Sequence, residues 1–265
     1  MQDNKDRISL TRRAAVKLGM GGALAFGATT LVPFTARAAG MGDEYETDSG
    51  KIAIHPVQHA SFVMKAPGEG GETVIYNDPV GGAALFADYP RPDLILITHE
   101  HGDHFSVETL EALVGEGTRL LTNPAVFGKL PDGLKAKASS IANGESATIA
   151  GIPIEAVPAY NITEDRRKYH PQGRDNGYVL TIGGKRVYIA GDTEDTPEMR
   201  AQKDILVAFV PMNLPFTMDV EQAASAIKAF KPAYVYPYHY KGSDPVALAS
   251  RVGGDSKVVQ GPWYG

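Results

Sequence analysis

An apolar run that ends in a dense cluster of imidazoles and carboxylates constrains this chain more than any other feature. Residues 93–98 read Asp-Leu-Ile-Leu-Ile-Thr, and residues 99–104 follow at once as His-Glu-His-Gly-Asp-His. Branched apolar residues after Pro90 and Pro92 predict a buried strand, so the cluster occupies the loop at its carboxyl end. Binding sites in layered α/β folds usually lie at that end. The sequence therefore predicts a metal-binding loop that directly follows a strand.

The spacing within the cluster suits two metal ions better than one. His99 and His101 are two positions apart on an extended segment, so their side chains project to the same side. The turn that follows can bring Asp103 and His104 to a neighbouring point, whereas Glu100 alternates away and is expected to support a ligand or to be solvated. The chain contains no cysteine, which excludes thiolate ligands and leaves imidazole and carboxylate, which suit zinc, iron, manganese or nickel.

Two metal ions need more donors than this cluster offers, because a catalytic metal takes about three protein ligands or shares a bridging one. Three downstream residues are the candidates: His170, Asp192 and His239. Asp192 and His239 each follow an apolar run that is typical of a strand. A layered fold could therefore bring both to the sheet edge that carries the first cluster.

The rest of the chain alternates short apolar runs with turn signals, which is typical of an α/β layered domain. Strands are predicted at 51–54, 62–64, 73–76, 94–98, 119–122, 146–149, 152–157, 178–182, 186–190, 205–210, 233–236 and 257–259. Apolar residues at helical spacing predict helices at 107–114, 220–230 and 245–252. Ser106 and Asp219 are expected to cap the first two, and Gly183-Gly184 predicts a hairpin turn.

The amino terminus has the pattern of a twin-arginine signal peptide. Arg12 and Arg13 precede an apolar stretch from 18 to 32 that glycines interrupt, and the small-x-small segment 36–38 follows. We predict cleavage after Ala38, recognition by the twin-arginine export machinery, a periplasmic or otherwise exported location and a single domain over 39–265. The alternative is contact with the membrane through an uncleaved anchor, but the stretch is shorter than the roughly 20 residues of a span.

The charge balance argues against nucleic acid as a partner. The whole chain has 26 basic and 31 acidic side chains, a net charge of −5. The predicted signal holds six of the basic and two of the acidic ones, so residues 39–265 carry a net charge of −9. A surface that binds phosphate backbones is normally basic. We therefore expect a small-molecule substrate instead.

Three motifs in chain order resemble those of the metallo-β-lactamase superfamily. They are His99-x-His101-x-Asp103-His104, Gly191-Asp192-Thr193 and His239. Residues 58–62 (Gln-His-Ala-Ser-Phe) and 76–79 (Tyr-Asn-Asp-Pro) resemble the opening strands of one branch, which includes ascorbate-phosphate lactonase-like and N-acylphosphatidylethanolamine phospholipase-like hydrolases. The resemblance implies a four-layer αββα sandwich with two metal ions at one edge of the sheets.

Carried over by position, the resemblance implies a ligand set. His99 and His101 bind the first metal, Asp103, His104 and His239 bind the second, and Asp192 bridges them. Asp103 and Asp192 are then the expected catalytic carboxylates. The third histidine of the first metal usually follows the strand that here ends at 157–161, which lacks one. His170 is expected to reach back from the loop, with Asn161 as the alternative donor.

Four residues are expected to support the metals or to contact substrate. His59 resembles a site-proximal histidine of the same branch, with core packing as its alternative. Asp78 is expected to orient a ligand histidine through its other ring nitrogen, or to cap a turn with Pro79. Tyr160 and Asn161 lie in a predicted loop from which they could reach a substrate.

The leading functional hypothesis is an exported hydrolase that uses a metal-bridging hydroxide on a small ester, lactone or phosphodiester. Two divalent ions are expected, with Zn²⁺ foremost and Mn²⁺, Fe²⁺ or Ni²⁺ as alternatives. Loop cations at Arg167, Lys168 and Arg174 favour an anionic substrate.

Two hypotheses from other classes remain open. One is a di-iron redox protein, although such relatives resemble a pattern with a carboxylate in place of His101 and need a flavin domain, for which no residues remain. The other is a non-catalytic metal-binding or sensing protein of the same fold.

Overall fold

The computed structural model describes residues 42–68 and 70–264. The predicted signal segment 1–38 and its cleavage site therefore lie outside the described residues. The described residues all belong to one unit of the chain. None of the helices in that part of the chain is both long and apolar enough to span a membrane.

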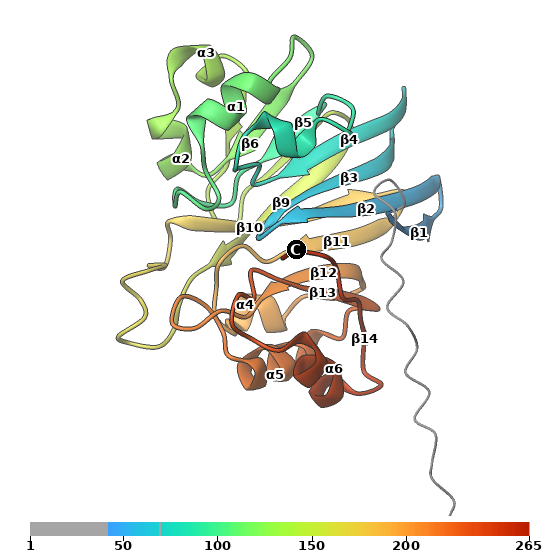
Figure 1. Ribbon diagram of the computed structural model, residues 1–265, viewed down its shortest axis with the longest axis vertical. Coiled ribbons are helices and arrows are strands. Elements are labelled where there is room, and N and C mark those ends of the chain that lie inside the picture. Colours follow the sequence, from blue (N-terminus) through green and yellow to red (C-terminus); the bar gives the residue numbers. More distant parts are fainter. Residues whose placement is uncertain (1–41, 69, 265) are drawn as a thin grey trace, which may run out of the picture. The chain divides into compact units, whose positions relative to one another are not determined.

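Two seven-stranded sheets form the centre of this unit (Figure 1). The strands of the first sheet are β1 (Asp43–Thr47), β2 (Gly50–Gln58), β3 (Ser61–Gly68), β4 (Gly71–Asn77), β5 (Leu94–Leu96), β6 (Arg119–Thr122) and β7 (Ala138–Ser140). The strands of the second sheet are β8 (Ser146–Ile149), β9 (Ile152–Ala159), β10 (Asp175–Ile182), β11 (Lys185–Ile189), β12 (Ile205–Pro211), β13 (Tyr234–Tyr238) and β14 (Lys257–Val258).

The two sheets repeat the same strand plan. In each sheet four antiparallel strands, β1–β4 or β8–β11, are followed by three strands that run parallel to the fourth. Antiparallel neighbours can be joined by tight turns, but parallel neighbours need a crossover, usually a helix. The helices therefore cluster in the parallel halves. They are the 3₁₀ helix η1 (Ala83–Phe86), α1 (Val107–Leu113), α2 (Pro124–Lys129), α3 (Asp132–Lys135), α4 (Pro197–Arg200), α5 (Val220–Phe230) and α6 (Pro245–Val252).

Three apolar layers hold the sheets and helices together. The central layer lies between the two sheets and includes Phe62 of β3 stacked on Phe209 of β12, with ring centroids 4.0 Å apart. The second packs residues of α1 such as Leu110 against the outer face of the first sheet. The third packs residues of α5 such as Ile227 and Phe230 against the outer face of the second sheet. The predicted αββα sandwich is confirmed.

Local sequence signals correspond to the observed ends of the elements. The side chain of Ser106 accepts the backbone N–H of Thr109 at the start of α1. Asp219 forms a reciprocal capping box with Gln222 at the start of α5. The Gly183-Gly184 turn joins β10 to β11, and both glycines have positive φ (49° and 71°), which this tight hairpin requires.

Some short elements were not expected from the sequence. They are β1, β7, α2, α3 and α4. Strand β1 is mostly charged and buries only Tyr45, so it lacks an apolar alternation. The helices span four to six residues, which is too short for a helical period. Asn123, whose side chain accepts the N–H of Val126 ahead of Pro124, is the cap signal from which α2 could have been predicted.

The aromatic stack in the central layer gives a stability prediction. Phe209 is fully buried between Phe62 and Tyr236, so Phe209→Ala should lower the free energy of unfolding by about 3–5 kcal/mol. Urea denaturation measures the change. Val246→Ala on α6, where Val246 is 62% exposed, is the control and should change it by under about 0.5 kcal/mol. A similar small change for Phe209→Ala would contradict the packing described.

Candidate metal centre

The seven predicted ligand residues come together at one edge of the sandwich. His99 to His104 lie in the loop after β5, Asp192 follows β11 and His239 follows β13. These strands belong to the parallel halves of the two sheets, so their carboxyl ends meet at this edge. His170 reaches the same edge from the loop between β9 and β10.

One group consists of three histidines. Ligand nitrogens of His99, His101 and His170 all lie within 4.8 Å of one another. His170 is 1% exposed and His99 is fully buried. Asn161, the alternative donor, would bind a metal through its amide oxygen Oδ1, which is buried without a hydrogen-bond partner, while its amide nitrogen donates to the backbone carbonyls of Arg166 (3.0 Å) and Phe216 (2.7 Å). His170 is the residue whose ring nitrogen lies within 4.8 Å of those of His99 and His101, so it occupies the third position of this group.

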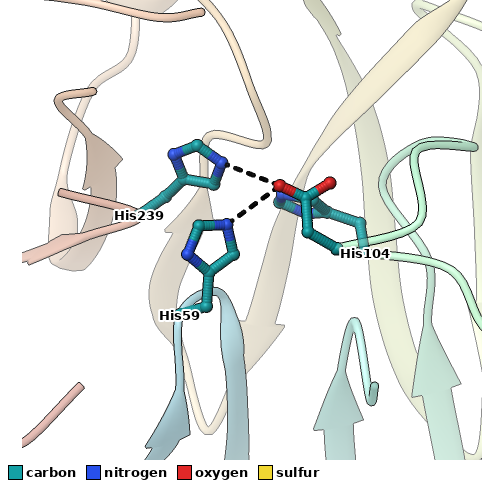
Figure 2. A group of neighbouring side chains, drawn as sticks. His59, His104 and His239 are labelled. Carbon is teal, nitrogen blue, oxygen red and sulfur yellow. Dashed lines mark hydrogen bonds and ion pairs between the residues drawn. The ribbon is translucent and has the colours of Figure 1, made fainter. Parts of the chain in front are cut away.

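A second group consists of His59, Asp103, His104 and His239, with ligand atoms again within 4.8 Å of one another. Figure 2 shows the His59 and His239 rings side by side, with dashed lines to one carboxylate oxygen. Those lines are the contacts of Asp103 Oδ2 with His59 Nε2 (3.1 Å) and His239 Nε2 (3.5 Å). The predicted second ligand set therefore lies together, and His59 lies beside it.

Asp192 lies between the two groups. Its Oδ2 is 3.4 Å from His170 Nε2 and 3.9 Å from His99 Nε2, both in the first group. The same oxygen is 3.2 Å from His239 Nε2, and Oδ1 is 3.5 Å from His104 Nε2, both in the second. Asp192 is 2% exposed. This position is the one that a bridging carboxylate needs.

Unsatisfied buried atoms test whether these residues fit metal ions. Among the described residues, four ligand atoms of the two groups and Asp192 are buried without a hydrogen-bond partner. They are His99 Nε2, His104 Nε2, His239 Nε2 and Asp192 Oδ1. A buried polar atom without a partner costs about 1–3 kcal/mol. Divalent cations coordinated by imidazole and carboxylate satisfy all four, so the donor set fits metal binding.

The electrostatics of the centre favour added positive charge. Burial lowers the pKa of His99 and of His101, which keeps both rings neutral, as ligation requires. Burial also lowers the pKa of His104, but Asp192 and Asp78 outweigh it and raise that pKa to about 9. Burial raises the pKa of Asp192, but His239, His104 and His170 outweigh it and lower that pKa. A cation held by these histidines and Asp192 would supply the positive charge that the buried carboxylates attract.

In each group, a buried acid orients one histidine. It contacts the ring nitrogen Nδ1, while Nε2 faces the other ligands. Asp78 Oδ2 lies 2.8 Å from His104 Nδ1, and Asp78 also accepts the N–H and hydroxyl of Thr98. Asp175 Oδ2 lies 3.0 Å from His170 Nδ1. Such outer partners fix the ring orientation of metal ligands. Asp78 thus has the contact that the sequence predicted.

Asp175 was missed by the sequence reasoning. Its carboxylate is held by Arg174 through Nε at 2.7 Å and Nη2 at 2.8 Å. Arg174 was a candidate for substrate contact, with an ordinary solvated charge as the alternative. Its guanidinium instead binds Asp175 and the carbonyl of Tyr169 and lies 3.5 Å from His101 Nε2. The only signal in the sequence was an acid five positions after His170, which carries little information by itself.

The predicted site residue Tyr160 forms its hydrogen bond outside the centre, and Glu194, which the sequence did not indicate, orders the loop that carries His170. The hydroxyl of Tyr160 donates to Glu198 (3.0 Å), away from both groups of ligands. Buried Glu194 accepts two backbone N–H groups, from Ile162 and Thr163, and pairs with Arg166. These contacts show how a loop can hold a ligand that lies far along the chain from its strand.

The backbone is unusual at several points of the centre. His59, Asp78 and His239 all have positive φ, at 55°, 41° and 46°, a region that non-glycine residues rarely adopt and that often marks functional sites. Gly191, just before Asp192, has φ 67°, and a Cβ there would lie 2.8 Å from the carbonyl oxygen of Asn176. Only glycine fits there, which explains the Gly-Asp pair.

A cavity of about 1040 Å³ adjoins the second group. His59 and Asp103 form part of its wall, together with the aromatic residues Tyr240 and Tyr264. Among the described residues that line it, Lys241 is the single lysine or arginine. The cavity is large enough for a small organic molecule.

Comparison with known proteins assigns the family. Residues 53–239 match the family model for the beta-lactamase superfamily domain. The chain is 30% identical over 224 residues to a UPF0173 metal-dependent hydrolase of Thermococcus kodakarensis, covering 78% of this chain and 95% of that protein.

Two solved structures of metal-dependent hydrolases have a similar fold. A protein of Parabacteroides distasonis described as a metal-dependent hydrolase is 40% identical, with a TM-score of 0.76, over 84% of this chain and 99% of that chain. Igni18, a metallo hydrolase of Ignicoccus hospitalis, is 25% identical, with a TM-score of 0.65, over 79% and 94%.

The αββα sandwich with a histidine and aspartate cluster at its edge defines a metal-dependent hydrolase of the metallo-β-lactamase fold. The chain belongs to the UPF0173 metal-dependent hydrolases within the beta-lactamase superfamily.

The contact between Asp175 and His170 gives a prediction about metal binding. Asp175→Asn keeps the size of the side chain but weakens the hold on the His170 ring, so one metal equivalent should bind about 10–100-fold more weakly. Competition with a chelator measures the affinity. Asp165→Asn, at an exposed acid of the same loop, is the control. Unchanged affinity in Asp175→Asn would show that Asp175 does not orient a ligand.

Proposed function

We propose that this chain is an exported hydrolase that holds two divalent metal ions, with Zn²⁺ foremost, and cleaves a small ester, lactone or phosphodiester. The observation that carries the proposal is the place of Asp192, whose oxygens lie within 3.9 Å of histidines from both groups. A bridging carboxylate is typical of two-metal hydrolytic sites. The lactone and phosphodiester classes follow from the branch that the opening motifs resemble.

Metal ions bound there would supply an activated hydroxide at neutral pH and a Lewis acid for a carbonyl or phosphoryl oxygen. Zn²⁺ is proposed because neutral imidazole and carboxylate are its usual ligands where thiolates are absent. Mn²⁺, Fe²⁺ and Ni²⁺ accept the same donors, and metal analysis of the purified protein distinguishes them.

Asp103 and Lys241 are the residues proposed to orient water and substrate. The Asp103 side chain is 53% exposed and lines the cavity, so it can accept a hydrogen bond from an attacking water. Burial raises the pKa of Asp103, but the close contacts with His239 and His59 outweigh it and keep that pKa well below its usual value. Lys241 on the cavity wall provides a positive charge for an anionic part of the substrate. The cavity has room for a small molecule beside Asp103.

A hydrolytic panel tests the proposal. Metal-loaded protein should hydrolyse at least one member of a set of lactones, carboxylic esters and phosphodiesters, and a chelator should abolish the activity. His101→Ala and Asp192→Ala should each lower kcat/KM by more than about 100-fold, because each removes a proposed ligand. Glu111→Gln, an exposed change on α1, is the control. Full turnover in His101→Ala, or no hydrolysis by the loaded parent protein, would contradict the proposal.

Export is proposed from the twin-arginine pattern of residues 11–17. The change Arg12→Lys with Arg13→Lys removes the pair that the export machinery recognises while keeping the charge. In a bacterial host, the parent chain should appear in the periplasm as residues 39–265, and the double variant should remain in the cytoplasm. Cell fractionation with mass spectrometry of the amino terminus measures both. Equal periplasmic amounts of the two chains would contradict the proposal.

A further inference from the structure

A chain of hydrogen bonds links the C-terminal segment to the most exposed residue of the candidate metal centre. The hydroxyl of Tyr264 lies 2.8 Å from His59 Nδ1, and His59 Nε2 lies 3.1 Å from Asp103 Oδ2. We infer that Tyr264 and His59 are a positioning pair, in which Tyr264 acts through His59 to hold the carboxylate of Asp103 in place. The inference rests on the proposed function, because it gives Asp103 the role of a ligand in the second group.

The hydrogen-bonding roles along this chain follow from the acceptor at its end. An ionised carboxylate can only accept, so the N–H on Nε2 of His59 donates to Asp103. In the neutral ring Nδ1 is then an acceptor, and the hydroxyl of Tyr264 donates to it. The phenol thus selects the tautomer of His59 that reaches Asp103. Without the hydroxyl, the ring is free to carry its proton on Nδ1, and Asp103 then loses the hydrogen bond from His59 and keeps only its contact with His239.

Asp103 needs outside support more than the other members of the centre. Its side chain is 53% exposed, whereas those of His104, Asp192 and His239 are no more than 3% exposed. Packing on all sides fixes the buried residues. Asp103 follows Gly102, around which a Cβ would meet nothing within 4 Å, so its loop is not confined by close packing there. The contacts with His59 and His239 therefore determine where this carboxylate lies (Figure 2).

The backbone around His59 ties three separate segments together. The N–H of His59 donates to the carbonyl of Trp263 (3.2 Å), and the N–H of His239 donates to the carbonyl of His59 (3.0 Å). These bonds hold His59 at a φ of 55°, a conformation that costs about 1–3 kcal/mol and persists only where the surroundings impose it. The turn after β2, the end of β13 and the C-terminal segment thus form one assembly around the second group.

The C-terminal segment is anchored firmly enough to position a side chain. Trp263 is 1% exposed and packs edge-on between the sheets against Phe62 and Tyr238, at centroid distances of 6.2 and 5.9 Å. The next residue, Tyr264, lies against the ring of Tyr240 at 4.9 Å. The buried indole therefore fixes the point from which the Tyr264 hydroxyl reaches His59.

Tyr240 provides a matched control. Its ring packs against that of Tyr264, and both residues line the same cavity. Among the hydrogen bonds of residues 42–68 and 70–264, none involves the Tyr240 hydroxyl. The changes Tyr264→Phe and Tyr240→Phe each remove one hydroxyl and leave the edge-to-face pair of rings. Only the first removes the donor to His59.

Titration with Zn²⁺ tests the inference without any substrate. Tyr264→Phe should weaken the binding of one metal equivalent by about 10-fold and leave the other equivalent unchanged. Tyr240→Phe should leave both unchanged, and both variants should keep the melting temperature of the metal-free parent. Competition with a chelator of known affinity measures each step. A purely structural role for the Tyr264 hydroxyl would instead lower the melting temperature or weaken both equivalents together.

A double-mutant cycle shows whether Tyr264 acts through His59. His59→Gln should weaken the same equivalent, and Tyr264→Phe added to it should have no further effect, because the hydroxyl has lost the ring on which it acts. Additive effects, or parent-like Zn²⁺ affinity in Tyr264→Phe, would overturn the inference. A parent protein that binds Zn²⁺ yet hydrolyses nothing would overturn the proposed function, while the titration would still decide the positioning role.

Discussion

The burial of one carboxylate, Asp192, among four imidazoles is the interaction on which the candidate centre depends. A buried negative charge is costly unless positive charge or hydrogen bonds compensate it. Here the compensating groups are His99, His104, His170 and His239, which come from three different segments of the chain: the loop after β5, the loop between β9 and β10, and the end of β13. Because Asp192 contacts both groups of ligands, the complete centre forms only when all three segments are in place around it.

The repeated strand plan explains how these segments meet. In each sheet the three last strands run parallel to the fourth, so their carboxyl ends lie along one edge. The first sheet brings the loop with His99 and Asp103 to that edge, and the second brings Asp192 and His239. The aromatic stack of Phe62 on Phe209 lies in the layer between the sheets. Core packing and the metal centre are therefore two results of the same arrangement of strands.

Much of this arrangement could be predicted, because its signals are local. The cluster from 99 to 104, the Gly191-Asp192 pair and the capped helix starting after Asp219 each combine residue types whose chemistry allows few roles. Strands with apolar runs were also predictable, since burial requires such runs. The sandwich followed from the resemblance of these motifs in chain order to a known superfamily.

The parts that could not be predicted depend on contacts between distant residues. His170 lies in a loop, and only the fold shows that Asp175 turns its ring toward Asp192. Tyr264 and His59 are 205 positions apart, and no pattern in either segment indicates that they meet. Strand β1 was missed because its residues are mostly charged and its order comes from pairing with β2. In each case the partner in space, and not the neighbour in sequence, determines the role.

A crystal structure of the protein loaded with Zn²⁺, with anomalous scattering measured at the zinc edge, shows whether Asp192 bridges two metal ions. Two anomalous peaks are expected, one beside His99, His101 and His170 and the other beside Asp103, His104 and His239. An oxygen of Asp192 should contact both ions. A single peak, or two peaks of which one has no contact with Asp192, would contradict the bridging role on which the proposed chemistry is built.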